Sequence, residues 1–485
     1  MSFLRAMPSA LPRLAPSWVW RWPLLATILL TLFSVFSASA QVLTTLANFD
    51  GSQNGGLPVG ILVQGHDGNF YGVTWIGATG AYGGEVFKVT PAGTLTVVAL
   101  FTPRITSAYS GLVLGIDGNF YGQTDRGGGA GGCFDKCGTV FRVTGSGQLT
   151  LLKSLNGRTG KFPLSPLALA PDGSFYGPTE AGGSGCGTVF NITNSGQGTV
   201  VISFNHANGC VGGSLVAGTN GNMYGVTKNG GIESANCTGG RPGCGTIFML
   251  TQQGQATTLY KFDGSSGWSP SAALVQGGDG DFYGVTEAAN MGNGTIFRMT
   301  PSGALTFLHL FDGSDGSIPS GLTQGTDGNF YGTTLIGGTG SCTYGCGTIF
   351  RMTPQGQLTT LINFDGVGGG YHPSGLVQDT DGGFYGLTYY GGLNDYGTIY
   401  RLDVGLGPFV ITSPRFGVIG SQVNILGTNL IGTTAVSFNG TPATFTVVSA
   451  TLITATVPSG ATSGQVTVTT PSSVLKSNTN FVVLP

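Results

Sequence analysis

Charged side chains are scarce in this chain, and their two signs nearly balance. Only 8% of the residues are charged, with 19 Lys and Arg against 21 Asp and Glu, which gives a net charge of −2. A nucleic-acid-binding protein needs clustered positive charge because it must neutralise phosphates. No basic run follows the N-terminal segment, so we expect no nucleic-acid partner.

Sequence motifs typical of catalytic sites are missing as well. The sequence contains no HExxH spacing, no Gly-x-Ser-x-Gly elbow and no phosphate-binding loop with its Lys. Its few histidines are scattered along the chain, at His66, His206, His309 and His372. We therefore predict no cofactor and no metal site.

Long apolar runs and helical periodicity are absent after the first 40 residues, so we predict no later transmembrane segment. Within those residues, arginines precede an apolar stretch from Pro23 to Phe36, and Ala38-Ser39-Ala40 supplies the small residues of a cleavage site. We predict a signal peptide over residues 1–40; the alternative is an uncleaved anchor. The mature protein would then be secreted and extracellular or at the cell surface, with the periplasm as another destination.

Glycine, in contrast, is abundant, with 88 residues, and much of it belongs to one repeated motif. Asp-Gly-Asn-Phe-Tyr-Gly, with small variations, occurs seven times at a spacing of about 52 residues, which is typical of a four-stranded propeller blade. The copies begin at Asp67, Asp117, Asp172, Asn220, Asp279, Asp327 and Asp381. Each unit reads as four short strands, rich in β-branched and aromatic residues. Strand a is of the Gly-Leu-Val-Gln-Gly type, strand b of the Phe-Tyr-Gly-x-Thr type, strand c of the Thr-Ile-Phe-Arg-Met-Thr type and strand d of the Leu-Thr-x-Leu-x-x-Phe type.

The order of these strands predicts how the repeats end. Leu43 to Phe49 matches strand d but precedes the first strand a, and the last unit stops at Leu402 without a strand d. We predict that the N-terminal strand completes the last sheet, because this pairs an otherwise bare edge. The expected fold is all-β: a seven-bladed β-propeller over residues 41–404, closed by its N-terminal strand, then a small immunoglobulin-like β-sandwich over 408–485.

The eight cysteines are an even number, which favours disulfides in an oxidising compartment. We predict four pairs in the loops: Cys133 with Cys137, Cys186 with Cys210, Cys237 with Cys244, and Cys342 with Cys346. The alternative is a zinc site, for which thiolates from different repeats would have to converge.

The aspartates of the repeated turns have two interpretations. The Asp of Asp-Gly-Asn bonds its own backbone in a turn, and the alternative is a calcium site. The same holds for the Phe-Asp-Gly turns after strand d, among which Asp312 to Asp315 is acidic enough to suggest a cation site. We favour the turn role for both sets and assign the following Phe and Tyr to packing between repeats.

Ligand contacts are expected on the face that carries the long b-to-c and d-to-a loops, because variable loops on a rigid scaffold commonly build binding sites. The position after the Thr of strand b varies most and enters this face. It is occupied in successive repeats by Trp75, Asp125, Glu180, Lys228, Glu287, Leu335 and Tyr389. The charged members are either solvated residues at an exposed loop mouth or a polar ligand patch, and Trp75, Tyr389, Trp268 and Tyr390 are candidates for stacking on sugar rings.

The two parts of the chain resemble known families. Gly427 to Leu430, Val436 to Ala443 and Ile453 to Gly464 resemble an IPT/TIG domain, an immunoglobulin-like module. The repeated Asp-Gly-Asn-Phe-Tyr-Gly and Gly-Thr-Ile-Phe-Arg-Met-Thr motifs resemble the bacterial tandem repeats called GloVer-containing. This resemblance implies an exported bacterial protein and no established reaction.

Two functions follow from these observations. The first is a non-enzymatic exported protein, which we expect to be a monomer, that binds a glycan or a protein ligand through the variable-loop face. The second is a polysaccharide lyase or hydrolase that uses Asp125, Glu180 or Glu287; such chemistry depends on the separation of two carboxyl groups, which the sequence does not give.

Overall fold

The structure is a computed structural model that describes residues 41–78, 83–128, 137–234, 237, 243–265, 267–288, 292–366 and 368–485. The chain divides into two units, Met1–Ala40 and Gln41–Pro485. The predicted signal peptide lies outside the described residues. Within these ranges, no helix is long and apolar enough to cross a membrane.

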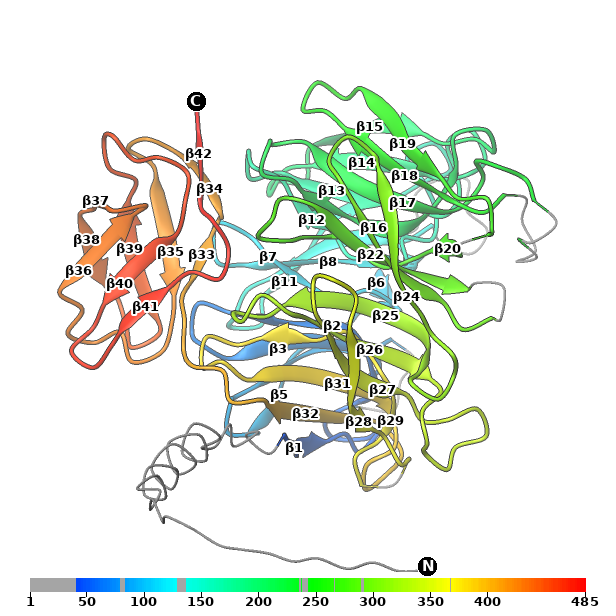
Figure 1. Cartoon of the computed structure of the whole chain (residues 1–485), viewed down its shortest axis with the longest axis horizontal. Coiled ribbons are helices and arrows are strands. Elements are labelled where there is room, and N and C mark those ends of the chain that lie inside the picture. Colours follow the sequence, from blue (N-terminus) through cyan, green and yellow to red (C-terminus); the bar gives the residue numbers. More distant parts are fainter. Residues whose placement is uncertain are drawn as a thin grey trace, which may run out of the picture. The chain divides into compact units, whose positions relative to one another are not determined.

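The repeat region is a series of antiparallel sheets (Figure 1). One four-stranded sheet is typical, with β25 (Ser317–Gln324), β26 (Phe330–Ile336), β27 (Thr348–Met352) and β28 (Leu358–Asn363) paired in chain order. Four other sheets repeat this order. The first two are β2 (Gly56–Gln64), β3 (Phe70–Ile76), β4 (Glu85–Val89) and β5 (Leu95–Leu100), and then β7 (Val113–Leu114), β8 (Phe120–Thr124), β10 (Thr139–Val143) and β11 (Leu149–Ser154). The next two are β12 (Ala168–Leu169), β13 (Phe175–Pro178), β14 (Thr188–Ile192) and β15 (Gly198–Ser203), and then β16 (Cys210–Ala217), β17 (Met223–Asn229), β18 (Thr246–Leu250) and β19 (Ala256–Lys261).

Two sheets have an inner strand in two pieces. In one, β20 (Trp268–Pro270) and β21 (Val275–Gln276) both pair with β22 (Phe282–Ala288), followed by β23 (Thr295–Met299) and β24 (Leu305–Leu310); in the other, β29 (Tyr371–Pro373) and β30 (Val377–Gln378) pair with β31 (Phe384–Tyr390). A small ladder joins β6 (Ile105–Thr106) to β9 (Arg126–Gly127). The Leu-Val-Gln pattern that predicts strand a covers only the second piece of each of these inner strands.

The first strand of the chain belongs to the last sheet of the repeats. β1 (Val42–Asn48) pairs with β32 (Thr398–Asp403), in a register that places Val42 opposite Asp403 and Asn48 opposite Thr398. β32 in turn pairs with β31, so β1 is the edge strand of this sheet. The predicted position of the N-terminal strand is therefore confirmed.

Aromatic residues of the repeated motif pack between neighbouring sheets. The Tyr283 ring lies 3.9 Å from that of Phe330 in the next repeat, measured between ring centroids, and Tyr331 lies 4.2 Å from Phe384. The Tyr283 hydroxyl donates to Asp279 at 2.8 Å, and the other oxygen of that carboxylate accepts the Asp281 amide. The Asp therefore shapes the turn and orients the Tyr, which supports the turn interpretation of this motif.

The Phe-Asp-Gly turns use their carboxylates in the same local way. Asp312 accepts the Ser314 hydroxyl at 2.7 Å and the Ser314 amide at 2.8 Å, and these bonds lower the pKa of Asp312 to about 2. Asp315 lies 2.7 Å from Nε2 of His309. Protein groups thus contact both carboxylates that suggested a cation site.

The C-terminal region forms a small β-sandwich. One sheet has the order β33 (Ile411–Ser413), β35 (Gln422–Leu426), β39 (Leu452–Thr456) and β38 (Phe445–Val447), and the other β37 (Thr441–Pro442), β36 (Ala435–Phe438), β40 (Val466–Thr469) and β41 (Val474–Lys476). β34 (Phe416–Val418) and β42 (Val482–Leu484) form a parallel pair. Between the sheets lies an apolar core that includes Ile425, Phe438 and Ile453.

This sandwich contacts the repeats directly. Phe416 and Val482 belong to an apolar cluster with Leu215 and Met223 of the fourth repeat, and the Thr451 hydroxyl donates to the His66 carbonyl at 3.2 Å.

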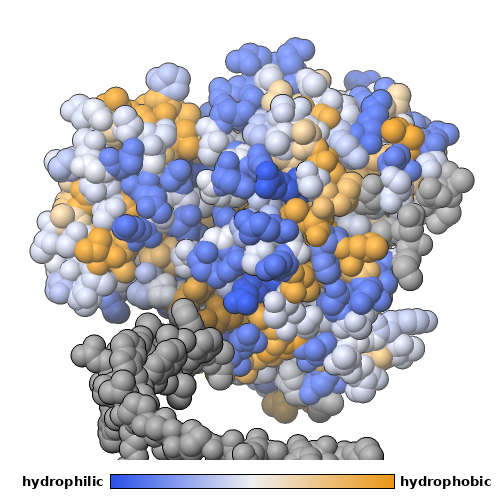
Figure 2. All heavy atoms as spheres, viewed as in Figure 1, coloured by the Kyte–Doolittle hydropathy of each residue, from blue (hydrophilic) through white to orange (hydrophobic). Residues whose placement is uncertain are grey.

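On the face shown in Figure 2, hydrophobic residues form small groups separated by hydrophilic ones.

Candidate ligand-binding cavity

The inner strands of the repeats begin with an unusual backbone conformation. A residue other than glycine adopts a positive φ immediately before a Pro, for example Ser269 with φ 63°, Ile318 with φ 56° and His372 with φ 56°. Such conformations persist only where the surroundings impose them. Here the amide of the same residue donates to a loop of the preceding repeat, as His372 does to the Cys346 carbonyl at 3.1 Å and Ser269 to the Cys244 carbonyl at 3.0 Å. Each inner strand that begins in this way is therefore anchored on its neighbour.

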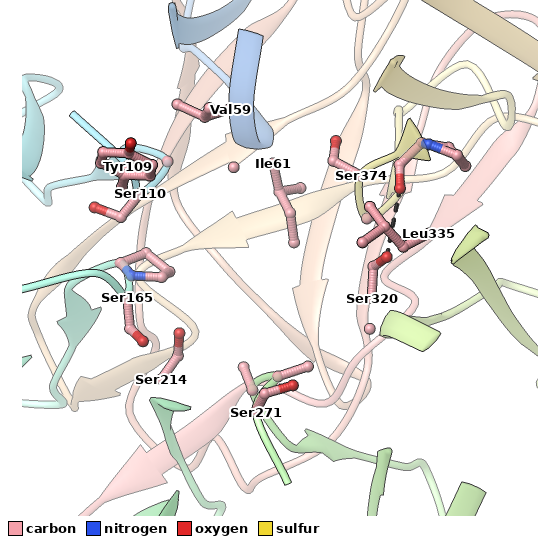
Figure 3. Close-up of a pocket in the computed structure, with 18 of the residues that line it drawn as sticks. Val59, Ile61, Tyr109, Ser110, Ser165, Ser214, Ser271, Ser320, Leu335 and Ser374 are labelled. Carbon is pink, nitrogen blue, oxygen red and sulfur yellow. Dashed lines mark hydrogen bonds between the residues drawn. The ribbon is translucent and has the colours of Figure 1, made fainter. Parts of the chain in front are cut away.

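A cavity of about 670 Å³ lies among these strands. Its lining comes from every repeat, and six of them contribute a serine (Figure 3): Ser110, Ser165, Ser214, Ser271, Ser320 and Ser374. In the first repeat Val59, Gly60 and Ile61 occupy the corresponding place, and Ile61 lies between the serines in Figure 3. The cavity thus combines the serine hydroxyl groups of six repeats with the apolar residues of the first repeat.

Some of these hydroxyls have weak or no partners in the protein. The Ser110 side chain is 2% exposed, and its Oγ has no hydrogen-bond partner among the described residues. Ser320 donates to the Pro373 carbonyl at 3.4 Å, the dashed line in Figure 3, and Ser374 to the Leu387 carbonyl at 3.5 Å. Since strong hydroxyl bonds have distances near 2.8 Å, these groups keep capacity for a ligand.

Aromatic residues complete one side of the cavity. Tyr389 and Tyr390 line it together with His372, and the two tyrosine rings are perpendicular with centroids 4.6 Å apart. Burial raises the pKa of Tyr389 to about 12, so its phenol stays a neutral donor at pH 7. Burial lowers the pKa of His372, so its imidazole is also neutral.

None of the described residues that line the cavity is Asp, Glu, Lys or Arg. The site offers hydroxyls, one imidazole and aromatic rings, and its described lining holds no charged side chain to pair with an ionic ligand. This arrangement suits an uncharged molecule with several hydroxyl groups and an apolar face.

Two of the seven predicted positions after the strand-b Thr reach this cavity, Leu335 and Tyr389. Trp75 is not among the lining residues; its indole Nε1 donates to the Ser107 hydroxyl at 3.2 Å. Asp125 is also elsewhere and only 6% exposed, so the expected solvent exposure is wrong for this residue. Burial raises the pKa of the Asp125 carboxyl, and Arg126 lies 3.6 Å from it.

The remaining charged candidates contact their neighbours. Lys228 Nζ lies 2.7 Å from the Glu287 carboxylate of the next repeat, and Ser269 donates to the same carboxylate at 3.4 Å. Glu180 is partly buried, and its amide donates to the Phe162 carbonyl at 3.1 Å. None of the three lines the cavity, and the ion pair between successive repeats was not predicted from the sequence.

Three of the predicted disulfides are present, Cys186–Cys210, Cys237–Cys244 and Cys342–Cys346. Cys133 lies outside the described residues. Nδ1 of His206 lies 3.5 Å from Cys186 Sγ and 3.7 Å from Cys210 Sγ, a grouping that resembles a metal site. Because the two sulfur atoms are bonded to each other, they do not act as thiolate ligands.

The serines of the cavity were not predicted. They stand shortly before a buried Leu of each inner strand, as in Ser110-Gly111-Leu112 and Ser374-Gly375-Leu376. This recurrence is present in the sequence, but the number of residues between the Ser and the Leu varies, so the pattern is difficult to recognise.

These sheets and the C-terminal sandwich define an all-β, propeller-like repeat protein with an immunoglobulin-like domain. The chain belongs to the Gloeobacter/Verrucomicrobia repeat family, which matches residues 106–238 and 234–442. An IPT/TIG domain matches residues 411–483. A search of curated proteins gives no match.

Several solved structures match this chain at TM-scores below 0.5. A fungal alcohol oxidase of the AA5 family, in complex with copper, is 11% identical over 90% of this chain and 98% of its own, with a TM-score of 0.49. The gluconolactonase XC5397 from Xanthomonas campestris is 11% identical over 54% and 78% of the two chains, with a TM-score of 0.35. A luciferin-regenerating enzyme is 13% identical over 76% and 97%, with a TM-score of 0.39. At such low similarity the activities of these proteins do not transfer to this chain.

Proposed function

We propose that this is an exported, non-enzymatic binding protein that recognises the end of a neutral glycan in the serine-lined cavity. The observation that most supports this proposal is the composition of the lining. It contains six serines together with Tyr389 and Tyr390, and no charged side chain among the described residues. Sugar rings present hydroxyls at their edges and C–H groups on their faces, and these match hydroxyl and aromatic groups respectively. A protein ligand through the same face is the alternative within this class.

We further propose that the repeats form a closed, seven-bladed β-propeller, with the cavity on its axis. Three contacts between the first and last repeats support closure. β1 pairs with β32, the Tyr385 ring stacks on Phe70 with centroids 4.2 Å apart, and the Leu57 amide donates to the Tyr396 carbonyl at 2.8 Å. The last two reproduce contacts that other neighbouring repeats make.

A polysaccharide lyase or hydrolase is the weaker proposal. Its candidate acids would have to face the bound sugar, yet Asp125, Glu180 and Glu287 are not among the residues that line the cavity. Asp125 is buried, and Glu287 is paired with Lys228. These positions favour structural roles between repeats.

Export is proposed from the N-terminal sequence and is consistent with the three disulfides found between described residues. The C-terminal domain would act as a spacer or docking unit. Its immunoglobulin-like sandwich contains only Arg415 and Lys476 as charged residues, so we expect no nucleic-acid binding there. We also propose that the whole protein is a monomer.

A glycan-array screen of the purified protein tests this proposal, followed by reducing-end and lyase-product assays on the hits. We expect a neutral glycan to bind without being cleaved. Tyr389→Ala should abolish the signal, whereas Tyr344→Ala should preserve it, because Tyr344 is 77% exposed and lies outside the cavity lining. Cleavage products, or equal binding by both variants, would contradict the proposal.

A further inference from the structure

A second cavity, of about 230 Å³, lies where the C-terminal domain meets the repeats. Thr412, Pro414, Arg415 and Phe416 form one wall of it. The opposite wall consists of Ala168 and Leu169 of β12 and Leu215 to Ala217 of β16, all of which are apolar. The cavity therefore brings one cation into largely hydrophobic surroundings.

Two polar side-chain atoms in this cavity have no hydrogen-bond partner among the described residues. Arg415 Nε and Thr412 Oγ1 are buried and make no hydrogen bond to any described residue, and Thr412 is only 6% exposed. The Arg415 guanidinium carbon lies 5.4 Å from the centre of the Phe416 ring, a cation–π contact. Burial lowers the pKa of the Arg415 guanidinium, as expected for a desolvated cation.

No nearby carboxylate in the described chain compensates this charge. The sequence from Phe409 to Pro485 contains no Asp or Glu, and no ion pair joins Arg415 to the described part of the repeats. Asp172 lines a different cavity at this junction, where it accepts the Ser174 amide and hydroxyl. A buried guanidinium nitrogen without a hydrogen-bond partner is unfavourable, and an external anion would satisfy it.

We propose that this cavity is a binding site for a small monocarboxylate, with Arg415 as its anchor and Thr412 as a second hydrogen-bond donor. A planar carboxylate accepts two parallel N–H bonds from a guanidinium fork, which matches one Arg in a confined space. A tetrahedral dianion such as phosphate would leave charge and oxygen atoms unpaired against the apolar wall. This inference is independent of the sugar site, because no residue lines both cavities.

Thermal unfolding in sodium acetate and in sodium chloride, at equal ionic strength and pH, provides the test. The melting temperature of the purified protein should rise with acetate and saturate, because a ligand that binds only the folded state stabilises it. Arg415→Met should remove this rise, whereas Arg158→Met should keep it, since Arg158 is exposed and outside the cavity. Sodium phosphate should have no saturable effect.

Calorimetric titration of acetate gives a second readout that does not depend on the Arg415 variant folding. Thr412→Val preserves the shape of the side chain and should weaken acetate binding about tenfold, the effect of one lost bond to a charged group. The proposal is overturned by the absence of acetate-dependent stabilisation in the unmodified protein, by an equal response to chloride or phosphate, or by undiminished acetate binding in both cavity variants.

Discussion

Glu85 allows a quantitative test of how the first repeat differs from the others. In the later repeats, two buried threonines face each other across strands b and c, as Thr286 and Thr295 do with hydroxyls 2.8 Å apart. In the first repeat Glu85 stands opposite Thr74 and is fully buried. One carboxylate oxygen accepts the Ala78 amide at 2.7 Å, and the other has no partner among the described residues.

Burial, with a smaller repulsion from Asp50, raises the pKa of Glu85 from 4.5 to about 7. The unfolded chain ionises this carboxyl at the lower pH, so ionisation favours unfolding between those values. Stability should therefore fall as the pH rises from 4.5 to about 7 and should level off above it. At about 1.4 kcal/mol for each pH unit, the loss from Glu85 is on the order of 3 kcal/mol.

Glu85→Gln removes the charge and keeps the size of the side chain. The variant should be more stable than the unmodified protein by about 2–3 kcal/mol at pH 8, and of similar stability at pH 5. Urea unfolding followed by tryptophan fluorescence at both pH values measures the difference, with Glu233→Gln at an exposed position as the control. A Glu85→Gln effect that is the same at pH 5 and pH 8 would refute this reasoning.

Three further predictions concern the contacts between repeats and the disulfides. Tyr283→Ala should lower the free energy of unfolding by roughly 3–5 kcal/mol, because a fully buried aromatic ring is lost; a urea-unfolding change below 1 kcal/mol would argue against the packing role. A double-mutant cycle of Lys228→Met and Glu287→Gln should give a coupling of about 0.5–1 kcal/mol, as for a partly exposed ion pair, and zero coupling would show that the pair contributes nothing. Thiol labelling of the denatured, non-reduced protein should detect no free cysteine, and more than one reactive thiol would contradict the predicted pairing.

The strand order of the repeats could be predicted because it depends on local signals. Turn residues and β-branched runs recur with the motif, and the unmatched strand at Leu43 indicated its pairing with the last sheet, as β1 and β32 now show. The alternating apolar residues of the predicted C-terminal sandwich likewise form strands, β35, β36, β39 and β40 among them. Periodic hydrophobic patterns are sufficient for such elements.

The cavity could not be predicted in the same way. Its serines stand at unequal distances before the following Leu, one residue for Ser214, two for Ser110 and three for Ser271, and the register of some inner strands is irregular, as in β16 and β25. A β-bulge changes which side chains face inward without a clear sequence signal. The burial of Asp125 and the pairing of Lys228 with Glu287 likewise depend on neighbouring repeats and not on local sequence.

Titration of the best neutral glycan into a cavity-blocked variant tests the central claim most directly. Ser320→Trp places a large side chain in the cavity lining, and Ser146→Trp places the same side chain at an exposed turn. The account predicts at least a hundredfold weaker binding for Ser320→Trp, with a melting temperature close to that of the unmodified protein, and unchanged binding for Ser146→Trp. Undiminished glycan binding by the folded Ser320→Trp variant would contradict it.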